Sequence, residues 1–305
     1  MDTSSISTSN STGGAPAGIW LPLITPFVDG ALDAPSLTRL AAHYVEQPID
    51  GFILTATTGE ALVLDDAETA RVVGLVAETV AQRKKLVLGL CGSDTRRLAK
   101  RLIETASWPI DGYLVTCPYY SRPSQEGLYR HFGALADETD RPVVVYNIPY
   151  RTGVNLANDT LLRLAERPNI VGVKDCCADA AQSADLLRRR PQGFSVLIGD
   201  DAVFYSGLTH GADGGILASA HIDTAAFAAV RDAVLAGRLA AARAGWNRLA
   251  ELVRLLFAEP NPAPIKHVLW RRGLIASPEL RLPMTGISPA LAARLDALVP
   301  KRDAA

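Results

Sequence analysis

Residues 142–175 read PVVVYNIPYRTGVNLANDTLLRLAERPNIVGVKD, and this stretch decides the fold class. Its two ends, residues 142–149 and 169–175, are short apolar runs without strict polar alternation, which is typical of strands buried on both faces. Residues 156–167 between them carry apolar side chains at helical spacing. A strand, a helix and a second strand with short connections predict parallel strands joined by a right-handed crossover.

The same alternation recurs along the rest of the chain. Six further apolar runs resemble the two above, at residues 18–27, 51–60, 85–92, 112–120, 194–201 and 214–220. Eight such units predict a closed (β/α)8 TIM barrel, whereas six or fewer would favour an open doubly wound sheet. One barrel of about 250 residues plus an extension accounts for the 305 residues of the chain as well as two domains would.

The predicted barrel has a segment of different composition on each side. Residues 1–17 are rich in Ser, Thr and Gly, and we expect them to form a disordered tail. The barrel then covers residues 18–236, ending in a helix at 225–236. Residues 237–305 contain no further strand pattern and predict a C-terminal helical extension, with helices at 239–257, 265–272 and 289–298.

Composition and charge exclude several classes of protein. The 31 Lys and Arg residues nearly balance the 32 Asp and Glu residues, and a formal net charge of −1 argues against a nucleic-acid-binding protein, which needs a cationic face. No apolar stretch reaches the roughly 20 residues that span a bilayer, and residues 1–17 lack the features of a signal peptide. We therefore expect a soluble, cytoplasmic protein.

Cysteine and histidine usage indicates neither a disulfide framework nor a metal site. Cys91, Cys117, Cys176 and Cys177 form no CxxC pair, and we expect small, reduced, largely buried side chains. The histidines lack metal-ligand spacing, and there is no GxGxxG or Walker motif, so no metal and no nucleotide cofactor is predicted. His221 follows the last apolar run, where it either faces the pocket or caps the next helix.

Lys174 is the least expected residue of the predicted strands. In a TIM barrel the catalytic groups lie at the C-terminal ends of the strands, and Lys174 closes the apolar strand IVGV. Burial disfavours the ammonium and lowers the pKa of a lysine, which yields the neutral amine that attacks a ketone. The alternative is a lysine that extends to solvent or pairs with a nearby aspartate.

Other strand ends supply groups that suit Schiff-base chemistry. Tyr146, Tyr120 and Thr57 carry hydroxyl groups that can transfer protons to and from a carbinolamine and an enamine. Thr58, with the backbone N–H groups around it, can donate hydrogen bonds to a substrate carboxylate. Arg151 can bind a second carboxylate through two parallel hydrogen bonds.

From residue 18 to about residue 285 the chain resembles the dihydrodipicolinate synthase / N-acetylneuraminate lyase family of pyruvate-dependent class I aldolases. The resemblance rests on motifs that occur in the order of the family: TTGE at Thr57, CPYYSRPSQEGLYRHF at Cys117, YNIPYRTG at Tyr146, VGVKD at Val171, GDD at Gly199, EPNPAPIK at Glu259 and RLPMT at Arg281.

The resemblance implies a role for each candidate residue. Lys174 forms the Schiff base with pyruvate, and the proton relay consists of Tyr146, Thr57 and Tyr120, the last reaching in from a neighbouring subunit. The remaining implied roles concern binding: Thr58 binds the pyruvate carboxylate, Gly199 and Ile216 line the pocket near the lysine, and Arg151 binds the carboxylate of the aldehyde. Members of the family are commonly homotetramers built from two tight dimers.

The arginine after YNIP is typical of the synthases that condense pyruvate with aspartate-4-semialdehyde in lysine biosynthesis. That reaction is the leading expectation. The chain departs from the synthase pattern at Ala56 and Ala61, in VKDCC around the lysine and in GGILASAH near the eighth run. These departures keep two alternatives open: a related aldolase or dehydratase acting on a sugar acid or an aromatic adduct, and an inactive paralogue that binds a keto acid.

Weak inhibition by L-lysine is a further implication of the resemblance. Lysine-sensitive synthases hold the amino acid with a serine after TTGE, two histidines in the next helix, and an asparagine and a glutamate after the third strand. The matching positions here are Ala61, Asp66, Thr69, Ser93 and Arg97. An arginine in place of the glutamate repels the ammonium of the ligand.

Overall fold

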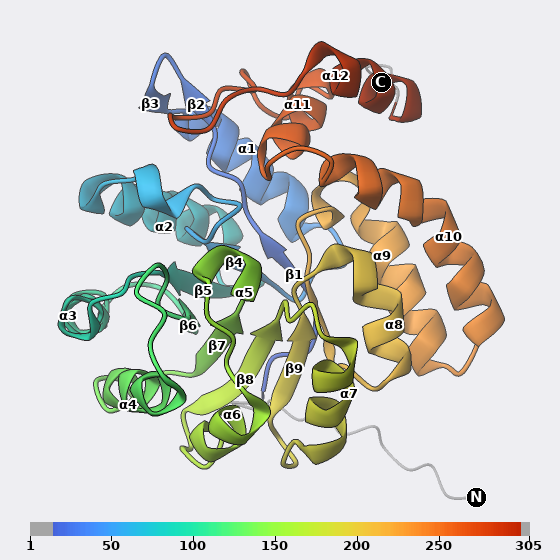
Figure 1. Cartoon of the computed structure of the whole chain (residues 1–305). Helices are drawn as coiled ribbons and strands as arrows, with labels where there is room; N and C mark the ends of the chain where they lie inside the picture. The colour runs from blue at the N-terminus through green and yellow to red at the C-terminus, as the bar shows by residue number, and fades with distance from the viewer. Residues whose placement is uncertain (1–14, 300–305) are drawn as a thin grey trace, which may run out of the picture.

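The computed structural model describes residues 15–299 and contains a closed barrel of eight parallel strands, which Figure 1 shows inside a ring of helices. The order around the barrel is β1-β10-β9-β8-β7-β6-β5-β4. The strands are β1 (Gly18–Pro22), β4 (Gly51–Leu54), β5 (Lys85–Leu90), β6 (Gly112–Thr116), β7 (Val143–Asn147), β8 (Ile170–Asp175), β9 (Ser195–Ile198) and β10 (Gly214–Ile216). Each of the eight predicted runs contains one of them, so the predicted TIM barrel is confirmed.

One main helix follows each barrel strand. In chain order these helices are α1 (Ala34–Val45), α2 (Asp66–Val80), α3 (Thr95–Glu104), α4 (Gln125–Ala136), α6 (Asn158–Leu164), α7 (Ala180–Arg189), α8 (Phe204–Thr209) and α9 (Ala220–Leu235). Several begin at side chains that satisfy the free N–H groups of the first turn. At α2, Asp65 accepts from the backbone of Glu68 while the Glu68 side chain accepts from the backbone of Asp65, which forms a capping box.

The core has two layers, which follow from the alternation of side chains along each strand. One buried cluster draws on strands around the barrel and fills its interior, with Trp20, Ile53, Val87, Leu114 and Leu197 among its members. The alternate strand residues pack with the apolar faces of the surrounding helices in a second, larger cluster. The strands are therefore buried on both faces, as their apolar runs predict.

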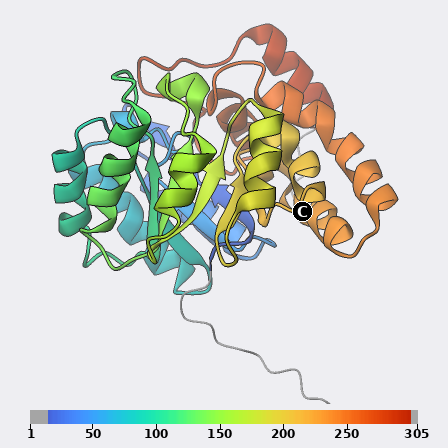
Figure 2. The ribbon, with the colours of Figure 1, turned by 60° about the horizontal axis from the view of Figure 1, so that its bottom comes forward.

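The C-terminal extension is helical, as predicted. Its helices are α10 (Leu239–Leu256), α11 (Ala263–Arg271) and α12 (Pro289–Leu298), and Figure 2 shows them against one side of the barrel. α10 packs against α9, and α12 packs against α10 and α11. The boundary between residues 236 and 237 stays a prediction. Within the described residues, no helix combines the length and the apolar character that crossing a membrane requires.

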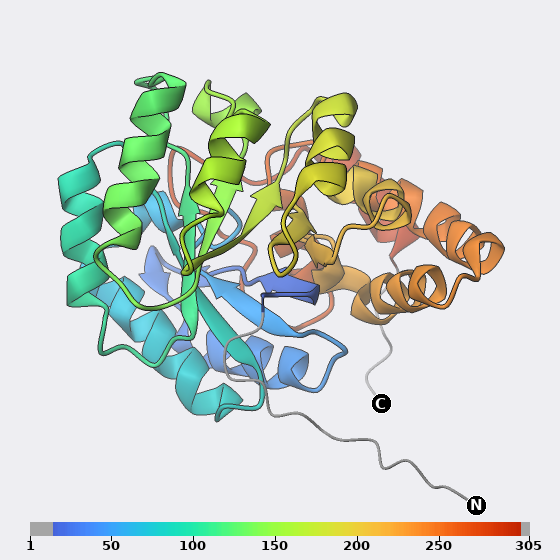
Figure 3. The ribbon, with the colours of Figure 1, turned by 90° about the horizontal axis from the view of Figure 1, so that it is seen from below.

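Residues 1–14 of the predicted tail lie outside the described residues. Residues 15–17 are described and approach the N-terminal end of the barrel: Pro16 accepts a hydrogen bond from the hydroxyl of Ser195, and Ala17 accepts one from the indole of Trp20 at 2.9 Å. Figure 3, which views the molecule from below, shows β1 beginning at this end.

Several local features differ from the sequence prediction. A small antiparallel hairpin of β2 (Phe27–Val28) and β3 (Ala31–Leu32) follows β1, and the short helix α5 (Pro149–Thr152) follows β7. The last barrel helix, α9, includes an additional turn from Ala220 that was not predicted; a kink at Asp223, where φ is −147°, separates this turn from the rest of the helix, which starts near the predicted residue 225.

Candidate active site

Lys174 lies at the C-terminal end of β8 with 5% of its surface exposed. Its register partner on the neighbouring strand β7 is Tyr146, and the Lys174 Nζ atom lies 4.2 Å from the centre of the Tyr146 ring. The two candidate residues that carry the proposed chemistry are therefore fixed to each other by the backbone ladder between two strands.

The surroundings of Lys174 favour its neutral form. Burial lowers the pKa of the amine, and the electrostatic influence of the neighbouring Cys176 and Asp201 side chains only partly opposes this shift. No ion pair of Lys174 is found among residues 15–299. Asp175 is occupied by other donors, since it accepts from the Ser183 hydroxyl at 2.6 Å and from the Cys177 backbone at 2.9 Å. The alternative of a solvent-exposed or aspartate-paired lysine is therefore wrong.

Tyr146 is buried with 3% of its surface exposed, and burial raises the pKa of its phenol well above the usual value. The phenol is therefore protonated at neutral pH and can donate a proton to a developing oxyanion. The Cys176 thiol approaches the phenolic oxygen at 3.9 Å. Burial raises the pKa of Cys176 to about 12, so this thiol stays protonated beside the lysine.

Gly199 and Ile216 lie on the same side of the barrel interior as the lysine. A methyl group at Gly199 would approach Lys174 Cγ and Cε at 2.7 Å, so this glycine, directly after β9, leaves the room that the lysine side chain fills. Ile216 at the end of β10 belongs to the interior cluster that also contains Tyr146 and Cys176. Both residues thus lie in the neighbourhood that the resemblance implies.

Thr57 and Thr58 lie in a turn directly after β4. Thr57 is half-buried and faces a cavity of about 310 Å³, while Thr58 is buried and its Oγ1 atom accepts from Asn261 Nδ2 at 2.9 Å. Two non-glycine residues of left-handed conformation bracket the threonines, Thr55 with φ 50° and Glu60 with φ 54°. Such backbone persists only where its surroundings hold it, and it is common at functional sites.

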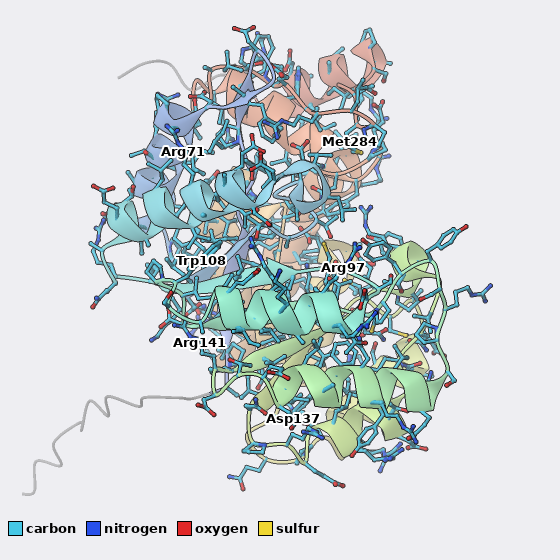
Figure 4. All side chains as sticks on the ribbon, turned by 90° about the vertical axis from the view of Figure 1, so that its left-hand side faces the viewer. Arg71, Arg97, Trp108, Asp137, Arg141 and Met284 are labelled. Carbon is cyan, nitrogen blue, oxygen red and sulfur yellow. The ribbon has the colours of Figure 1, made fainter. Side chains whose placement is uncertain are left out.

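Arg151 lies in α5 and is exposed. It lines both the cavity of about 310 Å³ and a second cavity of about 680 Å³ beside α10. Gly199 and Asn261 also line the larger cavity, and Met284 lines the smaller one. Figure 4 shows Met284 on the face of the molecule where α2, α3 and α4 lie. The Arg151 guanidinium lies 5.3 Å from the centre of the exposed Tyr150 ring and remains open to solvent on the side of the cavities.

Tyr120 is not brought into the site of its own chain. Its side chain is 94% exposed, and it lines neither of the two cavities. Its φ of 70° and the hydrogen bond from its backbone N–H to the Thr152 carbonyl at 3.1 Å fix a backbone that projects the ring outward. The neighbouring Tyr119 turns inward and lines the smaller cavity.

Two further sequence expectations concern His221 and the cysteines. His221 is buried within α9, where its Nδ1 atom lies 2.8 Å from the Ala218 carbonyl and its ring packs edge-on against Tyr44 at 5.3 Å. It lines neither cavity. All four cysteines are free; Cys117 and Cys176 are buried, whereas Cys91 and Cys177 are only partly buried.

Asn261 and Cys176 are site residues to which no role was given from the sequence. Asn261 belongs to the EPNPAPIK motif. The motif indicates that this segment matters, but it does not predict the hydrogen bond to Thr58. Cys176 stood out only as half of an unusual Cys-Cys pair. Its proximity to Tyr146 depends on the pairing of two strands and has no local signal.

A TIM barrel that carries a buried lysine of lowered pKa on its sixth strand, beside a protonated tyrosine, has the architecture of a class I aldolase. The family comparison agrees, because the sequence model of the dihydrodipicolinate synthetase family matches residues 15–301. The chain belongs to this family.

Similar proteins cover almost the whole chain. The 4-hydroxy-tetrahydrodipicolinate synthase 2 of Clostridium acetobutylicum is 44% identical over 279 residues, which are 92% of this chain and 98% of the relative. The 4-hydroxy-tetrahydrodipicolinate synthase of Laribacter hongkongensis is 38% identical over 92% of this chain and 96% of its own length.

Solved structures show the same fold. The dihydrodipicolinate synthase of Aquifex aeolicus superposes with a TM-score of 0.90 at 32% identity, covering 94% of this chain and 100% of its own. The chloride-inhibited enzyme of Acinetobacter baumannii, solved with pyruvate, superposes with a TM-score of 0.89 at 34% identity, covering 92% of this chain and 97% of its own.

Proposed function

We propose that the chain condenses pyruvate with L-aspartate-4-semialdehyde through a Schiff base on Lys174, which is the 4-hydroxy-tetrahydrodipicolinate synthase reaction. The observation that carries this proposal is the buried Lys174 amine, which has no ion pair in residues 15–299 and lies over the ring of the protonated Tyr146, 4.2 Å from its centre. The family membership and the activity named for the relatives support it.

The first half of the reaction forms the imine. The neutral Lys174 amine adds to the ketone carbon of pyruvate, and the carbonyl oxygen leaves as water after it has received protons. Tyr146 is placed to supply a proton to that oxygen and to recover one from the nitrogen. Both protons of the water thus come from the amine, Thr57 exchanges protons between Tyr146 and the cavity that Thr57 lines, and Thr58 binds the pyruvate carboxylate.

The second half forms the carbon–carbon bond. The imine nitrogen takes up a proton while the Tyr146 relay removes one from the pyruvate methyl group, which gives an enamine whose terminal carbon attacks the aldehyde carbon of the second substrate. As the bond forms, the nitrogen becomes an iminium and the aldehyde oxygen takes the proton that the relay carries; water or the amino group of the second substrate then attacks the iminium carbon and releases the Lys174 amine. Arg151, exposed at the mouth of both cavities, binds the carboxylate of this substrate.

The imine is tested by borohydride reduction in the presence of pyruvate, followed by mass mapping of the adduct. Lys266 is an internal control, because it is also buried and its pKa is lowered to about 8, but it forms an ion pair with Glu60. We expect one reduced pyruvyl group on Lys174, none on Lys266, and no adduct in Lys174→Met. An adduct at another lysine would overturn the proposal.

The aldehyde is tested by offering pyruvate together with a panel of aldehydes, in wild type and in Arg151→Ala. Charged hydrogen bonds contribute about 1.5–3 kcal/mol, so the variant should lose about 10- to 100-fold in condensation with aspartate-4-semialdehyde while it still forms the borohydride adduct. Arg254→Ala is the matched control, because Arg254 lines the larger cavity but hydrogen-bonds Glu251. An unchanged rate in Arg151→Ala would favour a sugar-acid or aromatic substrate.

A tetramer of two tight dimers in the cytoplasm is part of the proposal. The support for the dimer is the outward Tyr120, which is 94% exposed and can serve a relay only in a neighbouring subunit. The support for the location is the biosynthetic activity named for the relatives.

A further inference from the structure

The turn that contains Thr57 and Thr58 is held by residues some 200 positions later in the chain. The amide of Asn261, between α10 and α11, donates to Thr58 Oγ1 at 2.9 Å across a separation of 203 residues. Asn261 has 8% of its surface exposed and Thr58 has 4%, so water has little access to either side chain. The hydrogen bond is therefore stronger than a solvated one and is costly to leave unmade.

This contact determines which way the Thr58 hydroxyl can donate. A threonine hydroxyl has one proton and can accept two hydrogen bonds. Because one acceptor position is filled by the Asn261 amide, the proton is directed away from that amide, and no other hydrogen-bond partner of Thr58 Oγ1 is found among residues 15–299. The hydroxyl proton therefore has no acceptor among these residues, and the carboxylate of a bound ligand would supply one.

A second contact supports the same turn at Glu60. The Glu60 carboxylate forms an ion pair with Lys266 of α11, and it also accepts from the Arg281 backbone at 3.3 Å. Lys266 is completely buried, donates to the Glu279 carbonyl at 2.8 Å, and lies over the Phe27 ring at 4.3 Å. Since Glu60 has a left-handed backbone that is unfavourable for a non-glycine residue, these contacts hold a conformation that the turn would not keep alone.

We propose that the segment after α10 acts on the reaction by positioning the turn that binds the pyruvate carboxylate, with Asn261 as the positioning residue that orients the Thr58 hydroxyl and the Glu60–Lys266 pair as its support. This inference rests on the proposed function, since it assigns a task to Thr58. It gives the C-terminal extension a role in substrate binding although Asn261 is 87 residues away from Lys174 in sequence.

The experiment measures the pyruvate concentration that gives half-maximal borohydride trapping, together with the maximal rate of trapping. Both are independent of the aldehyde. The variants are Asn261→Ala, Thr58→Val and the double variant, with thermal unfolding of each as the measure of folding. Asn158→Ala is the matched control. Both asparagines have 8% of their surface exposed and a buried amide oxygen without a hydrogen-bond partner in residues 15–299, but the Asn158 amide donates to Gln182 and Asp185 on α7.

We expect Asn261→Ala to raise the half-saturating pyruvate concentration by about tenfold, the equivalent of one hydrogen bond of about 1.4 kcal/mol, with a much smaller change in the maximal rate. Thr58→Val should have a similar effect, and the double variant should be no worse than Thr58→Val, because the two residues act through one hydroxyl. Asn158→Ala should leave pyruvate saturation unchanged.

Three results would overturn the inference: normal pyruvate saturation in Asn261→Ala, multiplied effects in the double variant, or an equal effect of Asn158→Ala. If Asn261→Ala does not fold, Asn261→Asp provides the same test. This side chain of equal size can only accept when ionised, so it draws the Thr58 proton away from the ligand and should weaken pyruvate binding further than Thr58→Val does. If wild type forms no adduct at saturating pyruvate, the proposed function fails instead.

Discussion

Gly199→Ala should displace the Lys174 side chain without changing any reacting group. A methyl group on Gly199 would lie 2.7 Å from both Cγ and Cε of Lys174, and 2.5 Å from the Cys176 sulfur. Carbon atoms in contact are about 3.5–4.0 Å apart, so the lysine side chain must move by about 1 Å. Cγ is close to the backbone of β8, and a shift there carries the Nζ atom with it.

The size of the effect follows from this displacement. Overpacking of a closely packed interior costs about 1–3 kcal/mol of unfolding free energy. A misplacement of about 1 Å at a reacting group costs about 100-fold in rate. We therefore expect Gly199→Ala to fold, to unfold at a lower temperature, and to form the reduced pyruvyl adduct about 100-fold more slowly than wild type.

The assay is the rate of borohydride trapping at saturating pyruvate, measured well below the unfolding midpoint. Gly51→Ala is the matched control, because its methyl group would collide with the Trp20 ring and approach the Lys85 carbonyl at 2.8 Å, at the opposite end of the barrel strands. It should lose stability and keep the trapping rate. A wild-type trapping rate in Gly199→Ala would refute the placement of Gly199 against the nucleophile.

Three further predictions concern the assembly, the pH dependence and regulation. Mixed oligomers of inactive Tyr120→Phe and inactive Lys174→Ala should regain activity, because one hybrid site is intact; demonstrably mixed but inactive oligomers would contradict the role of Tyr120. Burial lowers the pKa of His131 to about 4, below its value of about 6.5 in the unfolded chain. The neutral, buried ring therefore stabilises the fold fully above a pH of about 6.5, and this stability is lost as the pH falls towards 4. His131→Gln should make the unfolding midpoint less dependent on pH between 7 and 5, whereas an equal slope would exclude this titration. Finally, L-lysine should not half-inhibit the initial rate below about 1 mM, since Arg97, whose side chain is 89% exposed, repels an ammonium.

The barrel could be predicted from the sequence because its signal is local. Each strand is a short apolar run buried on both faces, and each main helix shows its own spacing. Features that depend on one or two backbone angles have no such signal. The kink at Asp223 and the two-residue strands of the β2–β3 hairpin are of this kind, and they were not anticipated.

The residues of the candidate site also fall into those that the sequence could predict and those that it could not. Lys174 and Tyr146 could be located because strand ends of a barrel meet at one rim, and the register of β7 and β8 places them side by side. The bond between Asn261 and Thr58 could not be predicted, because it joins a loop after α10 to a turn after β4. The outward direction of Tyr120 follows from a left-handed backbone that a tyrosine rarely adopts.

The departures from the family pattern lie at positions where they leave the residues of imine formation in place. Ala61 lines the smaller cavity, and Cys176 follows the lysine by two residues, but neither alters the ladder that pairs Lys174 with Tyr146. Because that pairing is made by backbone hydrogen bonds, changes in flanking side chains leave it in place. The aldehyde, by contrast, is proposed to bind an exposed arginine on the short helix α5. Substitutions around the cavities should therefore change the partner of pyruvate more readily than they abolish the capture of pyruvate itself.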